Sequence, residues 1–196
     1  MSKRRQEGSE GSPVTQRVRL REGQLLPNVL VTGTPGTGKS AIALTICANR
    51  ELTHLSVSDF AKSLNAFDGW DKERECHILD EDKLLDAMEE KLGAGGYVVE
   101  YHACDFFPER WFDLVVVLRA RTEVLFDRLT QRGYAAEKVR ENLTCEITDL
   151  LLQEAKESYA HEIVVELQNN DTHDFDSNMS RILQWYDTWL TSRHTK

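Results

Sequence analysis

Residues 28–40 read Asn-Val-Leu-Val-Thr-Gly-Thr-Pro-Gly-Thr-Gly-Lys-Ser, an apolar run followed at once by a glycine-rich turn. The turn Gly33–Ser40 has the spacing G-x-x-x-x-G-K-[ST], which is typical of a phosphate-binding loop. Glycines let the backbone curl so that successive N–H groups point at phosphate oxygens. A helix that begins near Gly38 would add its positive amino-terminal end. The stretch therefore predicts a strand, loop and helix that together bind a nucleoside triphosphate.

Two side chains of this loop have predicted roles. We expect Lys39 to reach the β- and γ-phosphates, and Ser40 to hold Mg²⁺ as a direct ligand. Mg²⁺ that accompanies ATP is thus the expected cofactor. The loop says nothing about what is done with the triphosphate, so the reaction must be inferred from the rest of the chain.

Apolar runs and amphipathic segments alternate along the chain. The runs predict strands at 28–32, 54–57, 97–101, 114–118 and 163–167. The amphipathic segments predict helices at 38–49, 80–92, 122–131, 137–159 and 177–191. Near-continuous apolar strands are typical of a parallel sheet covered on both faces. The fold class predicted is α/β: a three-layer P-loop domain with a five-stranded parallel sheet and helices on both faces.

Composition divides the chain into a tail and a domain. Residues 1–24 are polar without an apolar period, and residues 1–22 hold six Lys/Arg against three Asp/Glu, so we predict a disordered basic tail. This tail could contact RNA, act as a nuclear address, or be an inert solvated segment. The net charge of the whole chain is −9, so the domain at 25–196 is acidic, which argues against broad nucleic-acid binding by its core.

Apolar runs, cysteine spacing and one long polar segment give further information about the class of protein. No apolar run approaches the ~20 residues that a membrane span needs. Four scattered cysteines without a C-x-x-C pair favour reduced thiols in an intracellular protein over structural zinc. The segment 59–79 is too long and too polar for a plain connection, and we expect it to form a lobe or lid that opens with a helix capped by Ser58 or Asp59.

Four further side chains are candidates for the chemistry. Glu100 ends a predicted strand where an acid near Mg²⁺ is expected, although it could also be a solvent-facing glutamate. His102 would point to the same side and could position water, or be structural. Arg128 and Arg132 lie four residues apart at a helix end, where they could balance charge on a transferred phosphoryl group or simply form a charged terminus.

Several motifs together resemble one family. They are the loop with its flanks at 26–40, Ile78-Leu-Asp-Glu-Asp82, Tyr101-His-Ala-Cys-Asp-Phe-Phe-Pro-Glu-Arg-Trp111 and Arg132-Gly-Tyr134. In order and spacing they resemble the atypical nuclear adenylate kinases, also described as adenylate kinase isoenzyme 6 or the coilin-interacting nuclear ATPase. The resemblance covers about residues 25–190 and excludes the tail.

The resemblance implies a nucleoside monophosphate kinase fold with an AMP-binding lobe about 56–79 and a short lid about 131–141. It implies the reaction ATP + AMP ⇌ 2 ADP with additional ATPase activity, and residence in the nucleus with some in the cytoplasm. We expect the enzyme to be a monomer. A small-subunit ribosomal protein or pre-ribosome is the implied partner, without direct sequence-specific nucleic-acid binding. An ATP-hydrolysing ribosome assembly factor with little AMP kinase activity is the alternative.

The resemblance also implies site residues. The implied ATP ligands are Gly36, Gly38, Lys39, Ser40, Ala41 and the lid arginine Arg132, and the implied catalytic residues are Lys39, Arg132, Glu100 and His102. Glu100 would also approach Mg²⁺, through water or directly, while Lys62 and Arg110 would bind AMP.

Three of these positions depart from the family pattern. The family commonly has Asp where this chain has Glu100, often has Arg where it has Lys62, and has a hydroxyl residue where it has Ala41. The longer Glu100 alters the reach of the carboxylate, and Lys62 lacks the bidentate fork of an arginine. We therefore expect ATP binding to be intact and recognition of the AMP phosphate to be weaker.

Overall fold

The structure is a computed structural model that describes residues 25–71 and 76–193; the tail expected at 1–24 lies outside the described residues. Five parallel strands form one sheet in the order β2-β5-β1-β6-β7. They are β1 (Val29–Gly33), β2 (Thr53–Ser56), β5 (Tyr97–Glu100), β6 (Leu114–Arg119) and β7 (Val164–Gln168). All five predicted strands are present, and the predicted fold class is confirmed.

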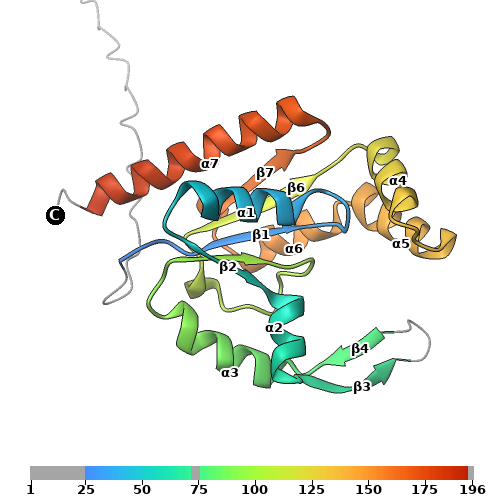
Figure 1. Ribbon diagram of the computed structural model, residues 1–196, viewed down its shortest axis with the longest axis horizontal. Coiled ribbons are helices and arrows are strands. Elements are labelled where there is room, and N and C mark those ends of the chain that lie inside the picture. Colours follow the sequence, from blue (N-terminus) through green and yellow to red (C-terminus); the bar gives the residue numbers. More distant parts are fainter. Residues whose placement is uncertain (1–24, 72–75, 194–196) are drawn as a thin grey trace, which may run out of the picture.

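Helices cover both faces of this sheet, as Figure 1 shows. Helix α1 (Lys39–Asn49) and helix α7 (Thr172–Arg193) pack on one face. Helix α3 (Glu81–Leu92) and helix α6 (Leu150–Ser158) pack on the other. Helix α4 (Thr122–Gln131) and helix α5 (Ala136–Ile147) share a small core of their own beyond the end of β6. The result is a three-layer α/β domain.

Alternation along the central strand explains the two cores. Val29 and Val31 of β1 face the α1 and α7 layer, whereas Leu30 between them faces α3 and α6. Successive strand residues point to opposite faces, so a strand buried on both sides needs apolar residues at every position. All of β1 is buried accordingly, and so is nearly all of β6.

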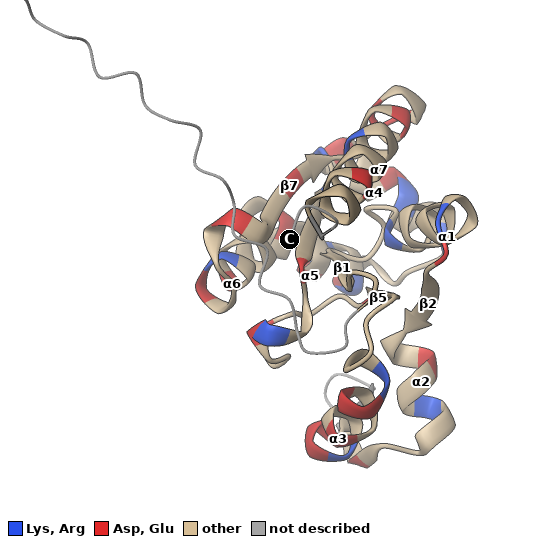
Figure 2. Cartoon of the chain, turned by 90° about the vertical axis from the view of Figure 1, so that its left-hand side faces the viewer, with Lys and Arg blue, Asp and Glu red and all other residues tan. Residues whose placement is uncertain are grey.

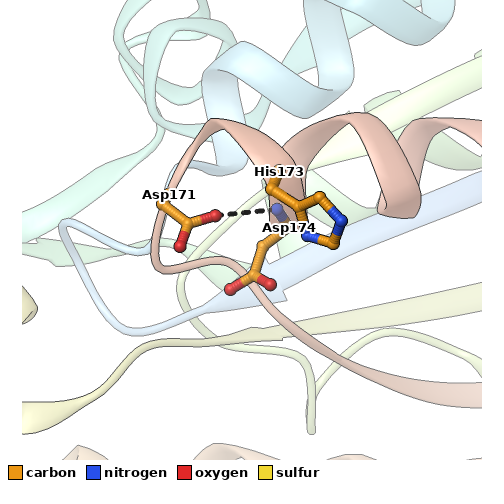
Figure 3. Close-up of side chains that lie close together, drawn as sticks. All are labelled: Asp171, His173 and Asp174. Carbon is orange, nitrogen blue, oxygen red and sulfur yellow. Dashed lines mark hydrogen bonds between the residues drawn. The ribbon is translucent and has the colours of Figure 1, made fainter.

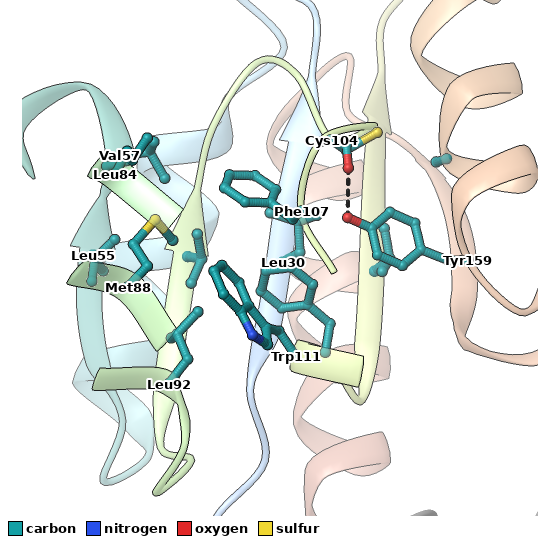
Figure 4. Close-up of a cluster of buried hydrophobic side chains, with 14 of the residues drawn as sticks. Leu30, Leu55, Val57, Leu84, Met88, Leu92, Cys104, Phe107, Trp111 and Tyr159 are labelled. Atoms are coloured by element: carbon teal, nitrogen blue, oxygen red, sulfur yellow. Dashed lines mark hydrogen bonds between the residues drawn. The ribbon is translucent and has the colours of Figure 1, made fainter. Parts of the chain in front are cut away.

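The segment that carried much of the resemblance is part of the core. Phe107 and Trp111 are buried against the α3 side of the sheet, and the Tyr159 hydroxyl donates to the carbonyl of Cys104 over 2.6 Å (Figure 4). The indole N–H of Trp111 also donates to the carboxylate of Glu89 on α3. These aromatic residues therefore fill the space between the sheet and the helices α3 and α6.

The segment between β2 and α3 holds a helix and a hairpin. Helix α2 (Val57–Leu64) begins directly after β2, and strands β3 (Phe67–Asp71) and β4 (Cys76–Leu79) pair antiparallel (Figure 1). The prediction that Ser58 or Asp59 caps this helix is wrong, because Ser56 takes that position and accepts from the Asp59 N–H. The hairpin was not predicted, since strand β3 is interrupted by Asp68-Gly69 and strand β4 is only four residues long.

One predicted helix is two. The expected helix at 137–159 breaks between α5 and α6 at Thr148 and Asp149, where Asp149 has a φ of 55°. An aspartate adopts this left-handed conformation more readily than most residues do. The break lets Asp149 Oδ1 accept from Nη2 of Arg119 at 2.6 Å, an interaction across 30 residues that no local pattern reveals. The last helix likewise begins at Thr172, five residues before its predicted start.

Acidic residues recur on the outward parts of α3 and α6, as Figure 2 shows, in agreement with an acidic domain. Within residues 25–71 and 76–193, no helix combines the length and apolar character that a membrane span requires.

Candidate nucleotide-binding site

The glycine-rich loop lies at the carboxyl edge of the sheet, between the end of β1 and the start of α1. Gly36 and Gly38 have φ values of 98° and 100°, which an L-residue rarely adopts. A Cβ atom at Gly36 would also lie 2.8 Å from Cδ1 of Leu125 on α4. The Thr37 N–H and hydroxyl both donate to the carbonyl of Thr34, which closes the turn. The sequence motif therefore folds as the predicted phosphate-binding loop.

Hydrogen bonds to the loop backbone hold the side chain of Lys39. Its Nζ donates to the carbonyl oxygens of Gly33 at 2.7 Å and Thr34 at 3.1 Å. Burial lowers the pKa of this ammonium group to about 8, a shift that the negative charge of Glu100 opposes and the positive charge of Arg132 reinforces. The ammonium group is thus held at the site by two carbonyl oxygens, and a phosphate ligand would favour the charge that burial disfavours.

Glu100 bridges the loop and strand β2. Its Oε1 accepts from the Ser40 hydroxyl at 2.5 Å, and its Oε2 lies 3.0 Å from Nε2 of His54. A hydroxyl and a carboxylate that meet beside a phosphate-binding loop are the hard oxygen donors that Mg²⁺ prefers. The residues present therefore fit the expected cation, with Ser40 and Glu100 as the groups that would hold it.

His102 lies just beyond this strand end. Its ring is 4.3 Å from that of Tyr101, centroid to centroid, and the residue is exposed. Desolvation by nearby protein atoms and the positive charges of Lys39 and Lys138 lower the pKa of its imidazole. The side chain is therefore neutral near pH 7 and shares the electrostatic environment of Lys39.

The two arginines of α4 have different surroundings. Arg128 donates from Nη1 to the carbonyls of Gly36 at 3.2 Å and Asn169 at 2.9 Å, and from Nη2 to that of Asn170 at 2.8 Å. Arg132 is exposed, and within the described residues no hydrogen bond or ion pair engages its guanidinium. Arg128 therefore joins the loop to the segment after β7, while Arg132 is available to a ligand. The two are not an equivalent pair.

A cavity of about 710 Å³ opens beside the loop. Its lining comes from the loop and α1, from the end of α4, and from the start of α7: Gly36, Gly38, Ala41, Arg128, Gln131, Arg132, Asn169, Asp171, Thr172 and Phe175. A volume in this range suits a nucleotide-sized ligand. The predicted ATP residues that line it are Gly36, Gly38, Ala41 and Arg132.

The wall formed by α7 is shaped by its own cap. Oδ1 of Asp171 accepts from the Asp174 N–H at 2.9 Å (Figure 3). The Asp174 carboxylate accepts in turn from the N–H and Nδ2 of Asn170. Asp171, His173 and Asp174 lie close enough to share a cation, but these bonds are those of a helix start. We interpret the cluster as the cap of α7.

Lys62 and Arg110 lie in different places. Lys62 is exposed on α2, which leaves the same sheet edge as Glu100, and its Nζ lies 3.3 Å from Oδ1 of Asp59. Arg110 lies at the opposite edge, next to the start of β6, where it pairs with Glu89 at 2.7 Å. A five-residue strand separates the two edges by roughly 15 Å. The structure therefore places Arg110 in an ion pair with Glu89, away from the loop, and its role in AMP binding stays a prediction.

Two residues of the site were not predicted from the sequence. His54 sits in a short polar strand and gains its significance only because β2 lies beside β5 in the sheet. Glu146 sits in α5, and its carboxylate reaches Thr34 of the loop across 112 residues. Neither contact has a local sequence signal, since both depend on the packing of distant elements.

Comparison with known proteins identifies the family. The family described as AAA domain matches residues 29–149. The chain is 48% identical over 163 residues to the adenylate kinase isoenzyme 6 homolog of Dictyostelium discoideum, covering 83% of this chain and 93% of that protein. For the adenylate kinase isoenzyme 6 homolog of Caenorhabditis elegans, the identity is 49% over 160 residues, covering 81% and 88%. The chain belongs to the adenylate kinase isoenzyme 6 family.

Solved structures of lower identity share the fold. Shikimate kinase from Acinetobacter baumannii in complex with shikimate has a TM-score of 0.58 at 17% identity, covering 84% of this chain and 94% of that one. A gluconokinase from Sinorhizobium meliloti has a TM-score of 0.55 at 14% identity, covering 86% and 98%. This chain therefore has the fold of P-loop kinases, and this fold together with the names of its relatives supports a kinase-type enzyme.

Proposed function

We propose that this chain transfers the γ-phosphoryl group of MgATP to AMP, giving two molecules of ADP. The observation that carries the proposal is the gathering of charged groups at the phosphate-binding loop: Arg132 lines the cavity beside Gly36 and Gly38, and Glu100 accepts from the Ser40 hydroxyl next to Lys39. Phosphoryl transfer needs positive charge around the moving group and an acid beside the cation. The names of the relatives support AMP as the acceptor.

Each residue then has a part in the transfer. The N–H groups of the loop bind the phosphates, and Lys39, held by Gly33 and Thr34, presents its charge to the β- and γ-phosphates. Mg²⁺, held by Ser40 and Glu100, would neutralise phosphate charge. Arg132 closes from the lid side onto the transferred group, and an ionised oxygen of the AMP phosphate attacks without a general base.

The acceptor site would lie on the α2 side of the sheet edge. Helix α2 leaves this edge at Ser56, which pairs with Glu100 in the sheet, and it carries the exposed Lys62. An ammonium group contacts a phosphate as a point charge and without the bidentate geometry of an arginine. We therefore propose that Lys62 binds the AMP phosphate with modest affinity.

Product analysis tests the reaction. Purified protein is incubated with MgATP and AMP, and we expect two ADP for each AMP consumed, with Lys39→Met inactive. Shikimate and gluconate serve as alternative acceptors, because the fold is shared with kinases for those substrates. Transfer to one of these with none to AMP would refute the proposal.

ATP hydrolysis is a second candidate activity, favoured by one observation. His102 is exposed beside Lys39 and has a lowered pKa, so a neutral imidazole is available to orient water at the phosphate end. We expect slow release of inorganic phosphate when AMP is absent, and His102→Phe should reduce it more than transfer to AMP. An equal loss of both activities would remove His102 from a specific role in hydrolysis.

The cellular setting stays a prediction. We propose nuclear residence and a small-subunit ribosomal protein or pre-ribosome as partner, on the strength of the family resemblance. A fluorescent fusion with and without residues 1–24 tests whether the basic segment directs localisation. Sedimentation analysis tests the expected monomer.

A further inference from the structure

A buried carboxylate outside the loop touches it. Glu146, in the last turn of α5, is 3% exposed and uses both oxygens. Its Oε1 accepts from Nε of Arg119 at 2.7 Å and from the Ala120 N–H at 2.9 Å. Its Oε2 accepts from the Thr34 hydroxyl at 2.5 Å. A buried carboxylate persists only where its charge is paired and its lone pairs are used, and both conditions hold here.

Thr34 connects this carboxylate to Lys39. The threonine is 1% exposed, and its hydroxyl donates to Glu146 while its carbonyl oxygen accepts from Nζ of Lys39 at 3.1 Å. The same carbonyl accepts from the N–H and hydroxyl of Thr37. The side chain of Thr34 is therefore fixed from outside the loop, and its carbonyl oxygen fixes both the turn and the lysine inside it.

We propose that Glu146 is a positioning residue for nucleotide binding, which acts through Thr34 to hold the phosphate loop and Lys39 in the conformation that accepts ATP. The assignment rests on the proposed function, because it gives Glu146 a part in the binding of the donor nucleotide. The link runs from the last turn of α5, a helix whose first residues overlap the expected lid at 131–141, to the second residue of the loop.

The role of Glu146 is distinct from a plain ion pair with Arg119. Arg119 contacts two further carboxylates, those of Asp149 at 2.6 Å and Glu166 at 3.5 Å, so its charge is compensated several times. Among the described residues, the hydroxyl of Thr34 has the Glu146 carboxylate as its only hydrogen-bond partner. Charge-assisted hydrogen bonds of this kind are stronger and more directional than neutral ones. The oxygen that faces the loop is therefore the part of Glu146 that the proposal concerns.

The test isolates this one hydrogen bond. Thr34→Val keeps the shape of the side chain and removes its hydroxyl, and Thr34→Ser keeps the hydroxyl and removes a methyl group. Asp149→Asn is the control within the same network, because it weakens an Arg119 contact without touching the loop, and asparagine tolerates the left-handed backbone there. Each full-length variant is measured for melting temperature, for ATP dissociation constant by calorimetry, and for the kcat and KM of transfer to AMP.

We expect Thr34→Val to raise the ATP dissociation constant about tenfold and to lower kcat, since one charge-assisted bond is lost. Thr34→Ser should stay within about threefold of the original protein, and Asp149→Asn should bind ATP unchanged. Glu146→Gln should weaken ATP binding as much as Thr34→Val does. The double variant Thr34→Val/Glu146→Gln should lose no more ATP affinity than either single variant.

Equal ATP binding by Thr34→Val and Thr34→Ser overturns the proposal, whatever their melting temperatures. Equal weakening of ATP binding by Thr34→Val and Asp149→Asn also overturns it, since that reports general destabilisation. The binding measurement is independent of the acceptor. Thus a protein that binds ATP in this pattern but fails to phosphorylate AMP would refute the proposed reaction and leave the positioning role standing.

Discussion

Removal of the Arg128 guanidinium should destabilise the wall of the site. Arg128→Met retains the apolar stem and deletes donors to three backbone carbonyls, at 3.2, 2.9 and 2.8 Å. Each such bond contributes about 1 kcal/mol net, and part of the total is offset because burial already disfavours the charge, as the lowered pKa of Arg128 shows. We expect a loss of about 2 kcal/mol in the free energy of unfolding. For a domain of this size, that is a fall of about 4–8 °C in melting temperature.

The matched control is Arg132→Met, one helical turn further along α4. Arg132 is exposed and its guanidinium has no described partner, so stability should change by no more than about 0.5 kcal/mol. Transfer to AMP should nevertheless slow by about 10³-fold, because a charge that stabilises the transferred group is lost. The two variants thus separate a structural arginine from a catalytic one on the same helix.

Urea unfolding and calorimetry measure stability, and single-turnover transfer measures the chemical step. The reasoning is refuted if Arg128→Met unfolds like the original protein while Arg132→Met is the destabilised variant. Loss of transfer in Arg128→Met with stability unchanged would also refute it, since Arg128 would then act on the phosphoryl group.

Three further perturbations test other parts of the site. Gly36→Ala should cost about 1–2 kcal/mol in stability and weaken ATP binding, because its φ is 98° and the new Cβ meets Leu125; thermal melts with and without ATP measure both effects. Lys39 has a pKa of about 8, so the folded chain binds fewer protons than the unfolded chain between pH 8 and 10.5, and stability from this group rises with pH across that window. ATP affinity should fall across the same window as the ammonium loses its charge, and Lys39→Met should abolish both trends in pH-dependent unfolding and calorimetry. Glu100→Asp should raise the Mg²⁺ concentration for half-maximal activity several-fold, because the shorter side chain cannot reach both Ser40 and His54; a metal titration that matches the original protein would contradict this role.

Much of the fold follows from local pattern. The buried strands, the loop and the position of Glu100 were predictable because apolar periodicity and the loop motif are encoded within short windows. The break of the helix at Asp149 was not, since it depends on Arg119 at the far end of β6. The hairpin β3–β4 was missed because its strands are short and neither alternates between apolar and polar residues.

The site shows the same division. Lys39, Ser40 and Glu100 were found by motif and by placement at a strand end, and the structure brings them together. The place of Arg110 could not be predicted, because residues that follow a strand in sequence need not stay at its carboxyl edge. The chain has returned to the amino edge by Trp111, whose carbonyl oxygen accepts from Nδ2 of Asn28. His54 and Glu146 had no signal of their own, because their contacts to Glu100 and Thr34 depend on the order of strands and the packing of α5.

The fate of the γ-phosphoryl group tests the central claim most directly. The protein is mixed with ATP labelled at the γ-phosphorus, Mg²⁺ and unlabelled AMP, and the products are separated after a single turnover. We expect the label in the β-phosphate of the ADP formed from AMP, and no labelled ADP with the Lys39→Met variant. Label that appears only in inorganic phosphate, at a rate independent of AMP, would contradict it.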